Sequence, residues 1–238
     1  MPVFPADERF TVPLYSVTEA ALHIDVPVST FRSWAPGYAR RGRRQRTVTG
    51  EPIVTTSPRD AGVSVPFVGL AEAHALAAVR RSGVPLQRIR PALQRLHDEL
   101  GIEHVLASRS LYTDGAEVLY DFAESRGDIP EARSARDLVV VRNNQRVFNE
   151  IIDDYLRRVE FAPDGWAQCI HLPKYRTADV VVGSRRSFGL SIFARGGVRL
   201  ETILAAFKAG ADIDDLTDEF GIPRDDLLSV LRVHTEAA

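Results

Sequence analysis

The sequence contains very little cysteine and lysine. Cys169 is the single cysteine among 238 residues, which excludes an internal disulfide framework and zinc sites built from several cysteines. Only Lys174 and Lys208 among the 30 basic residues are lysines. Arginine dominance of this kind can arise from genome base composition alone, so the placement of the arginines is more informative than their number.

Long apolar runs are also missing. The apolar stretches are short and interrupted by charge, so we expect no membrane-spanning segment. The N-terminal residues, Met1 to Arg9, include acids where a secretory signal needs an apolar stretch. We therefore expect a cytoplasmic protein, with a length that suits one large domain or two small ones.

The charge is unevenly distributed, although the formal net charge is only −2. Between residues 32 and 59 a series of arginines faces a single acid, Glu51, whereas acids outnumber bases between residues 200 and 238. The first segment is a candidate for binding a polyanion, and phosphate would repel the second.

Two short helices near the N-terminus form a helix-turn-helix pattern. Ser16 and Glu19 have the spacing of a capping box at the start of a helix over residues 16–23. Pro27 favours a second helix over residues 28–34. The spacing predicts a buried cluster of Val17, Ala20, Ala21, Val26, Phe31 and Trp34. The polar residues Ser29, Thr30, Arg32 and Ser33 would then face outward, and the first three of them could reach base edges.

The segment from Tyr38 to Val65, called the wing below, is rich in arginine, glycine, threonine and proline. We expect a long hairpin with short strands at residues 47–49 and 52–55, returning through residues 63–67. Its arginines can neutralise phosphates or enter a minor groove. The predicted DNA contacts of the wing are Arg40, Arg41, Arg43, Arg44 and Arg46.

The remaining patterns predict an α+β protein that is mainly α. Helices are expected over residues 69–80, 85–96, 200–209, 213–220 and 224–233. Strands are expected at 166–172 and 180–182, and an Asp-Gly turn predicts a hairpin over 111–120. We expect a winged helix-turn-helix domain at residues 1–125, a linker at 126–136 and a small strand-containing helical domain at 137–238.

Catalytic motifs are absent from the sequence, so we expect no enzyme and no cofactor. It contains neither a phosphate-binding Gly-x-x-x-x-Gly-Lys-Ser/Thr loop nor a Gly-x-Ser-x-Gly nucleophile elbow. Cys169 lies in an apolar strand pattern and is expected to be a buried structural thiol. The histidines show no metal-ligand spacing, so no metal site is expected.

Two segments resemble known families. The N-terminal segment resembles the N-terminal domain of MerR-type regulators. This resemblance covers residues 14–34, the wing and the stretch 67–96, which contains Val68-Gly69-Leu70-Ala71-Glu72-Ala73-His74-Ala75-Leu76 and Gly83-Val84-Pro85-Leu86-Gln87-Arg88-Ile89. The second segment resembles a small helical domain that is associated with antitoxins and was long catalogued as of unknown function. It begins at Val180-Val181-Val182, contains Ser187-Phe188-Gly189-Leu190 and Arg195-Gly196-Gly197, and extends to Asp225-Asp226-Leu227.

The order of these two segments is similar to that of large VapB-type antitoxins, which pair with PIN-domain ribonuclease toxins. The resemblance implies a homodimer, operator DNA as one partner and a toxin as the other. Because a PIN nuclease site is acidic, the resemblance also implies that an inserted arginine blocks it. By their position near the C-terminal turn, the candidates for toxin binding are Arg185, Arg186 and Arg195.

Other interpretations stay open at this point. The acidic C-terminal helices could instead meet a basic RNA-binding surface on the toxin. The chain could be a stand-alone MerR-like transcription regulator that senses a small molecule in a pocket near Trp166 and Tyr175. A structural or interaction protein without DNA binding is the third alternative.

Overall fold

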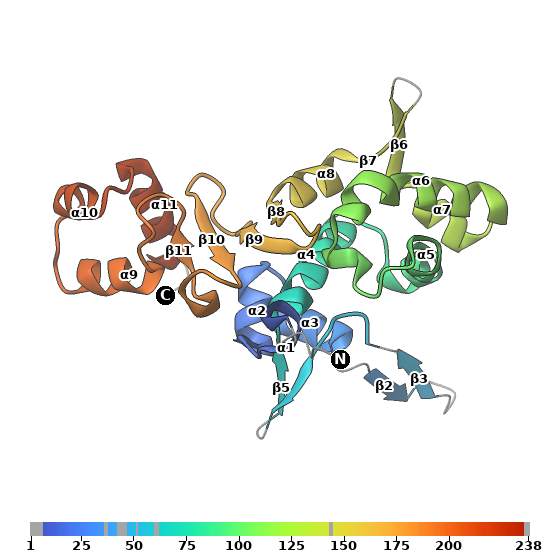
Figure 1. Cartoon of the computed structure of the whole chain (residues 1–238), viewed down its shortest axis with the longest axis horizontal. Coiled ribbons are helices and arrows are strands. Elements are labelled where there is room, and N and C mark those ends of the chain that lie inside the picture. Colours follow the sequence, from blue (N-terminus) through green and yellow to red (C-terminus); the bar gives the residue numbers. More distant parts are fainter. Residues whose placement is uncertain are drawn as a thin grey trace, which may run out of the picture.

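The computed structural model describes residues 7–35, 38–41, 47–50, 52–59, 62–142 and 145–235. These residues form an α+β protein that is mainly α, as the sequence predicts. Figure 1 shows an elongated molecule, with the C-terminal helices at one end, helices α5 to α7 at the other, and the N-terminal elements beneath the middle. No helix in the described ranges is long and apolar enough to cross a membrane.

The N-terminal elements confirm the predicted helix pair. After α1 (Glu8–Thr11) and β1 (Tyr15–Ser16), helices α2 (Val17–His23) and α3 (Val28–Trp34) pack against each other. The Ser16 hydroxyl accepts from the Glu19 amide at 3.2 Å, and the Glu19 carboxylate accepts from the Ser16 amide at 2.7 Å. This capping box begins α2 at the expected residue.

The wing contains two antiparallel hairpins. Strands β2 (Tyr38–Arg41) and β3 (Thr47–Gly50) pair in the first hairpin, and β4 (Ser57–Arg59) and β5 (Gly62–Val65) pair in the second. Strand β1 extends the second hairpin into a sheet with the order β1-β5-β4. The strand expected at residues 47–49 is confirmed. The strand expected at 52–55 is not formed, because the Ile53 and Val54 amides donate to the Trp34 carbonyl instead of to a neighbouring strand.

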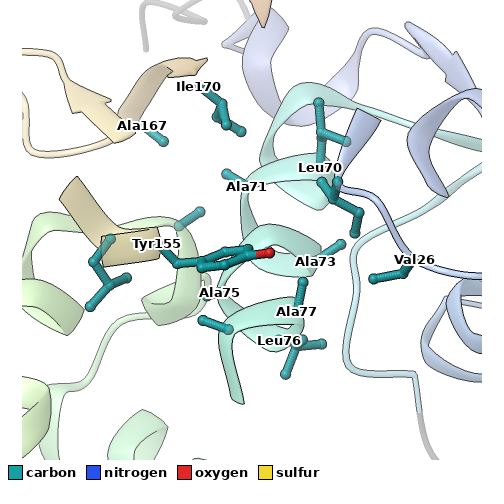
Figure 2. Close-up of a cluster of buried hydrophobic side chains, with 14 of the residues drawn as sticks. Val26, Leu70, Ala71, Ala73, Ala75, Leu76, Ala77, Tyr155, Ala167 and Ile170 are labelled. Carbon is teal, nitrogen blue, oxygen red and sulfur yellow. The ribbon is translucent and has the colours of Figure 1, made fainter. Parts of the chain in front are cut away.

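Helix α4 (Phe67–Arg81) lies at the centre of the fold, and its residues are buried from Phe67 to Val79. In Figure 2, alanines and leucines cover several sides of this helix, and Tyr155 of α8 lies alongside it. Gly69 allows the closest approach, because a Cβ atom there would lie 2.2 Å from the Thr55 carbonyl oxygen. A helix that is apolar on all sides is typical of a core element, which here packs against the wing, α1 and α8.

Helices α5 (Leu86–Leu100), α6 (Arg109–Arg126) and α7 (Pro130–Arg136) form one end of the molecule, with the 3-10 turn η1 (Val105–Ala107) before α6. The hairpin predicted over residues 111–120 is wrong, because this segment belongs to α6. The Asp-Gly signal is overridden since Gly115 packs tightly: a Cβ atom there would lie 3.0 Å from Leu111 and 3.1 Å from Phe148.

Helix α7 occupies residues 130–136, within the segment expected to be a linker. Ala132 and Ala135 are buried, and the helix packs against α5 and α6. The division of the chain into two domains stays a prediction.

The second half of the chain contains most of the remaining strands. The hairpin β6 (Val139–Arg142) and β7 (Gln145–Phe148) leads into α8 (Glu150–Arg157). An antiparallel sheet of order β11-β10-β9-β8 follows, built from β8 (Val159–Phe161), β9 (Ala167–His171), β10 (Val180–Gly183) and β11 (Ile192–Phe193). Strands β9 and β10 confirm the two strands predicted for this region.

Three helices complete the chain, all as predicted: α9 (Leu200–Lys208), α10 (Ile213–Phe220) and α11 (Arg224–Thr235). Their apolar residues, including Ile203, Leu216 and Leu227, are buried in the common core. The Asp212 carboxylate caps α10 by accepting from the Asp214 amide at 2.7 Å. Most of the acids in this unit are exposed, and several lie in the first turns of their helices, where the helix dipole favours them.

Candidate functional site

Helix α3 presents a polar face opposite the core. Phe31 and Trp34 are buried, Ser29 and Arg32 are exposed, and Thr30 is half-buried. The predicted inward face is confirmed, and so is the outward placement of Ser29 and Arg32. Ser33, also expected to face outward, is half-buried, and its hydroxyl donates to the Thr30 carbonyl at 2.6 Å. Such a face has the hydroxyl and guanidinium groups that read base edges in a major groove. Contact of Ser29, Thr30 and Arg32 with DNA stays a prediction.

The turn between α2 and α3 is fixed from outside the helix pair. Asp25 occupies this turn with a φ of +55°, a left-handed conformation that costs energy for a residue with a Cβ atom. The guanidinium of Arg81, at the end of α4, pairs with the Asp25 carboxylate and donates to its carbonyl oxygen at 3.2 Å. The central helix α4 is thereby joined to the turn that leads into α3.

The base of the wing is held by a partly buried polar cluster. The Glu72 carboxylate accepts hydrogen bonds from the Thr55 amide at 2.6 Å and from the Thr55 hydroxyl at 3.1 Å. His104 Nδ1 lies 2.9 Å from the same carboxylate, and this hydrogen bond raises the pKa of His104. Because Glu72 lies on α4, the wing and α3 are both anchored to the same helix.

Arg40 and Arg41 lie on β2 of the β2–β3 hairpin, which extends away from the body of the molecule in Figure 1. Arg40 pairs with Val48 across the hairpin, and Arg41 pairs with Thr47. Arg43, Arg44 and Arg46 lie outside the described residues. The backbone therefore places Arg40 and Arg41 on the hairpin that follows α3.

The C-terminal arginines lie in the loops after β10 and β11. Arg185, Arg186 and Arg195 are exposed, and their side chains form no ion pair within the described part of the chain. Arg185 and Arg186 line a cavity of about 300 Å³ together with Glu160 and Asp164, whereas Arg195 does not line it. The structure thus brings two of the three predicted toxin contacts together.

The same cavity contains the predicted buried thiol. Cys169 is buried in β9, and its burial raises the pKa of the thiol to about 12. A thiol with this pKa is protonated at neutral pH and unreactive, as expected. Across the described residues, no group of three side chains has the composition and geometry of a metal site.

A second cavity lies near one of the two residues at which the sequence suggested a ligand pocket. It has a volume of about 330 Å³ and lies between α2 and the 3-10 turn η2 (Ser187–Gly189). Tyr175, one of the two aromatic residues suspected of lining a ligand pocket, does line this cavity. The other, Trp166, packs edge-on against Phe10 with ring centroids 5.1 Å apart.

Comparisons with known proteins agree with this arrangement. Residues 13–93 match a family model described as "Putative DNA-binding HTH domain". Over 226 residues the chain is 45% identical to a Mycobacterium tuberculosis protein named "Putative antitoxin VapB45", and the match covers 94% of each protein. The X-ray crystal structure of Rv2018 from Mycobacterium tuberculosis is similar with a TM-score of 0.83 and 42% identity, covering 94% of this chain and 99% of that one.

The family match spans α2, α3, the wing and α4, the elements that position the polar face of α3. The match to the antitoxin extends over nearly the whole chain, so it includes the C-terminal sheet and helices as well. The chain therefore belongs to the VapB45 antitoxin family and carries a helix-turn-helix DNA-binding domain in its N-terminal part.

Proposed function

We propose that this protein is a non-enzymatic antitoxin that binds its own operator and neutralises a PIN-domain ribonuclease toxin. It acts as a cytoplasmic homodimer, and operator binding represses its own operon. The observation that carries this proposal is the polar face of α3, held by the Arg81–Asp25 pair in a helix-turn-helix domain of an antitoxin family.

In this proposal, DNA contacts come from α3 and the wing. Ser29, Thr30 and Arg32 enter a major groove, where hydroxyl and guanidinium groups distinguish base pairs. The wing arginines, Arg40, Arg41, Arg43, Arg44 and Arg46, neutralise phosphates or follow a minor groove. A MerR-like mode of docking, with the wing beside the recognition helix, fits this division of contacts.

Toxin binding is assigned to the C-terminal half. Arg185, Arg186 and Arg195 are exposed and unpaired within the described residues, so their charges are available to an acidic surface. A guanidinium forms bidentate hydrogen bonds with carboxylates, the groups that bind the metal in an acidic nuclease site. The exposed acids of α10 support the opposite arrangement, in which a basic toxin surface is the partner.

Operator binding is tested with a fluorescently labelled promoter fragment and full-length protein. Arg32→Ala should weaken binding by about tenfold or more, the cost of losing one specific base or phosphate contact. Arg232→Ala removes an exposed arginine of α11, outside residues 13–93, and serves as the control. If the wild-type protein does not distinguish its promoter from unrelated DNA, the DNA part of the proposal is wrong.

Toxin binding is tested by co-expressing the full chain with the protein encoded by the adjacent reading frame. Copurification of a PIN-domain protein, with loss of its ribonuclease activity, is the expected result. Charge reversal at Arg185 and Arg186 should abolish the complex, whereas reversal at Asp214 and Asp215 should leave it intact. The opposite pattern would assign the toxin contact to the acidic helices.

A small-molecule regulator is the second candidate, favoured by the cavity that Tyr175 lines. Its volume of about 330 Å³ lies within the range of ligand sites. A stand-alone regulator would have no PIN-domain gene beside it, and its operator affinity would change when a small molecule binds. Neighbouring gene content therefore separates the two candidates.

A further inference from the structure

The turn η2 holds an exposed aromatic ring in an unfavourable backbone conformation. Ser187, Phe188 and Gly189 have successive φ angles of +47°, +53° and +80°. Left-handed conformations are costly for residues with a Cβ atom, and for a bulky side chain they mark a strained site. Phe188 is also 84% exposed, so its ring gains almost no burial within the described structure. A strained and exposed aromatic residue of this kind is a candidate for contact with another molecule.

The ring of Phe188 stands at the edge of the 330 Å³ cavity described above, called the Phe188 groove here. Leu22, on α2, and Leu190 also line this groove and are 56% and 39% exposed. Apolar side chains that are exposed singly are ordinary, but a cluster around one groove is typical of an interaction site.

The wall of the groove contains a polar atom without a partner. Tyr15 is buried and lines the groove, and its hydroxyl makes no hydrogen bond to any described residue. Gly189 lies directly beside it, because a Cβ atom on Gly189 would approach the Tyr15 hydroxyl to 2.8 Å. Buried hydroxyls nearly always have partners, so an unpaired one at a groove indicates a missing contact.

The charges around the groove define the partner that would fit it. The groove itself is lined by two cations and two acids: Arg199, Lys174, Glu19 and Glu201. Glu19 is engaged in the capping box of α2. Arg185 and Arg186 directly precede the turn and give this face an excess of positive charge. The three arginines are exposed and form no ion pair among the residues that the structure describes. An apolar anchor on a face with an excess of positive charge is complementary to an acidic surface with an apolar pocket.

We infer that the Phe188 groove is a docking surface for the toxin, with Phe188 inserting into an apolar pocket on an acidic face of that protein. This inference rests on the proposed antitoxin function, and it adds an apolar anchor to the arginine contacts. Because Leu22 lies on α2, the docking surface extends from the C-terminal unit onto the helix-turn-helix domain itself.

The test measures the affinity of the full chain for the purified PIN-domain protein encoded by the adjacent reading frame, by surface plasmon resonance. Phe188→Ala should weaken binding by about 30-fold or more, as expected for an aromatic hot spot, and Leu22→Ala should weaken it to a smaller degree. Ile151→Ala is the matched control, because Ile151 is 44% exposed on α8 and does not line the groove. Circular dichroism melting curves establish that all variants are folded.

The outcomes separate this inference from the function on which it rests. If the wild-type chain does not bind the PIN-domain protein, the proposed function fails and the inference fails with it. If wild type, Phe188→Ala and Leu22→Ala bind within twofold of one another, the antitoxin function stands and the docking surface is wrong. If Phe188→Ala instead converts a dimer to a monomer in light scattering while toxin affinity is unchanged, the groove holds a second copy of the chain, and the inference is overturned.

Discussion

The central helix α4 contains a buried histidine that should make the fold sensitive to acid. His74 Nε2 donates to the Tyr155 carbonyl oxygen at 2.7 Å, while its Nδ1 atom has no partner among the described residues. Burial of the ring lowers the pKa of His74 to about 4. The test compares the free energies of unfolding of wild type and His74→Gln at pH 7.5 and at pH 4.5.

The magnitude follows from the difference between folded and unfolded states. The unfolded chain, with a histidine pKa of about 6.5, takes up a proton before the folded chain does as the pH falls. Stability from neutral His74 is therefore complete above pH 6.5 and is lost as the pH falls toward 4. With a folded pKa of about 4, this group alone should lower the free energy of unfolding by roughly 2.5 kcal/mol at pH 4.5.

Urea unfolding at the two pH values measures this loss. His74→Gln removes the titrating ring, so its free energy of unfolding should fall by roughly 2.5 kcal/mol less than that of wild type over the same pH interval. His23, whose pKa is also lowered to about 4 by burial, is present in both proteins, so its contribution cancels in the comparison. The substitution costs packing at every pH, and the change with pH is the quantity that tests the reasoning.

His104→Gln provides a control of opposite sign. The hydrogen bond to Glu72 raises the pKa of His104, so this residue stabilises the fold below its unfolded pKa and loses that contribution as the pH rises. Its replacement should therefore make the loss on acidification larger than in wild type. Equal losses in wild type and His74→Gln would refute the assignment of His74 as a buried neutral ring.

Gly69→Ala should lower the melting temperature and also weaken operator binding, because the Cβ atom of the alanine would lie 2.2 Å from the Thr55 carbonyl oxygen. Overpacking of this kind costs roughly 1–3 kcal/mol, so an unchanged melting curve would contradict the prediction. Phe188→Gly should leave the free energy of unfolding unchanged or raise it by up to about 1 kcal/mol, because glycine accepts a left-handed φ readily. A clearly lower free energy of unfolding in urea would mean that the ring packs inside the fold. Arg81→Ala should lower the free energy of unfolding by less than about 1 kcal/mol, since the pair that Arg81 forms with Asp25 is exposed. The same variant should weaken operator binding in fluorescence anisotropy, and an unchanged affinity would show that the turn keeps its shape without Arg81.

Local patterns in the sequence were sufficient for the helix-turn-helix. The capping box of Ser16 and Glu19 and the proline at residue 27 involve neighbours in the chain, and the apolar spacing of α3 fixed which face turns inward. The same holds for α4, α5 and the three C-terminal helices, whose glycine and proline boundaries are local signals. The separation of an arginine-rich wing from an acidic C-terminal unit was also readable, because charge needs no tertiary information.

The tertiary structure overruled the sequence where distant packing outweighed a local signal. The Asp-Gly pair at residues 114–115 is a strong turn signal, but Gly115 instead gives α6 a close contact with Phe148, which lies far along the chain. A helix that buries its face against a core gains more free energy than an isolated hairpin turn provides.

Some features of the candidate site were likewise predictable from local sequence patterns, and others depend on tertiary contacts. The sequence by itself determined which residues of α3 face outward and where the positive charge lies. Only the tertiary structure decided what holds that face in place, through Arg81 at Asp25, and what surrounds Phe188, through Tyr15 beside Gly189. These contacts join residues far apart in the sequence, so no local spacing encodes them. The first forms only when α4 packs against the helix pair, and the second only when the N-terminal elements pack against the C-terminal unit.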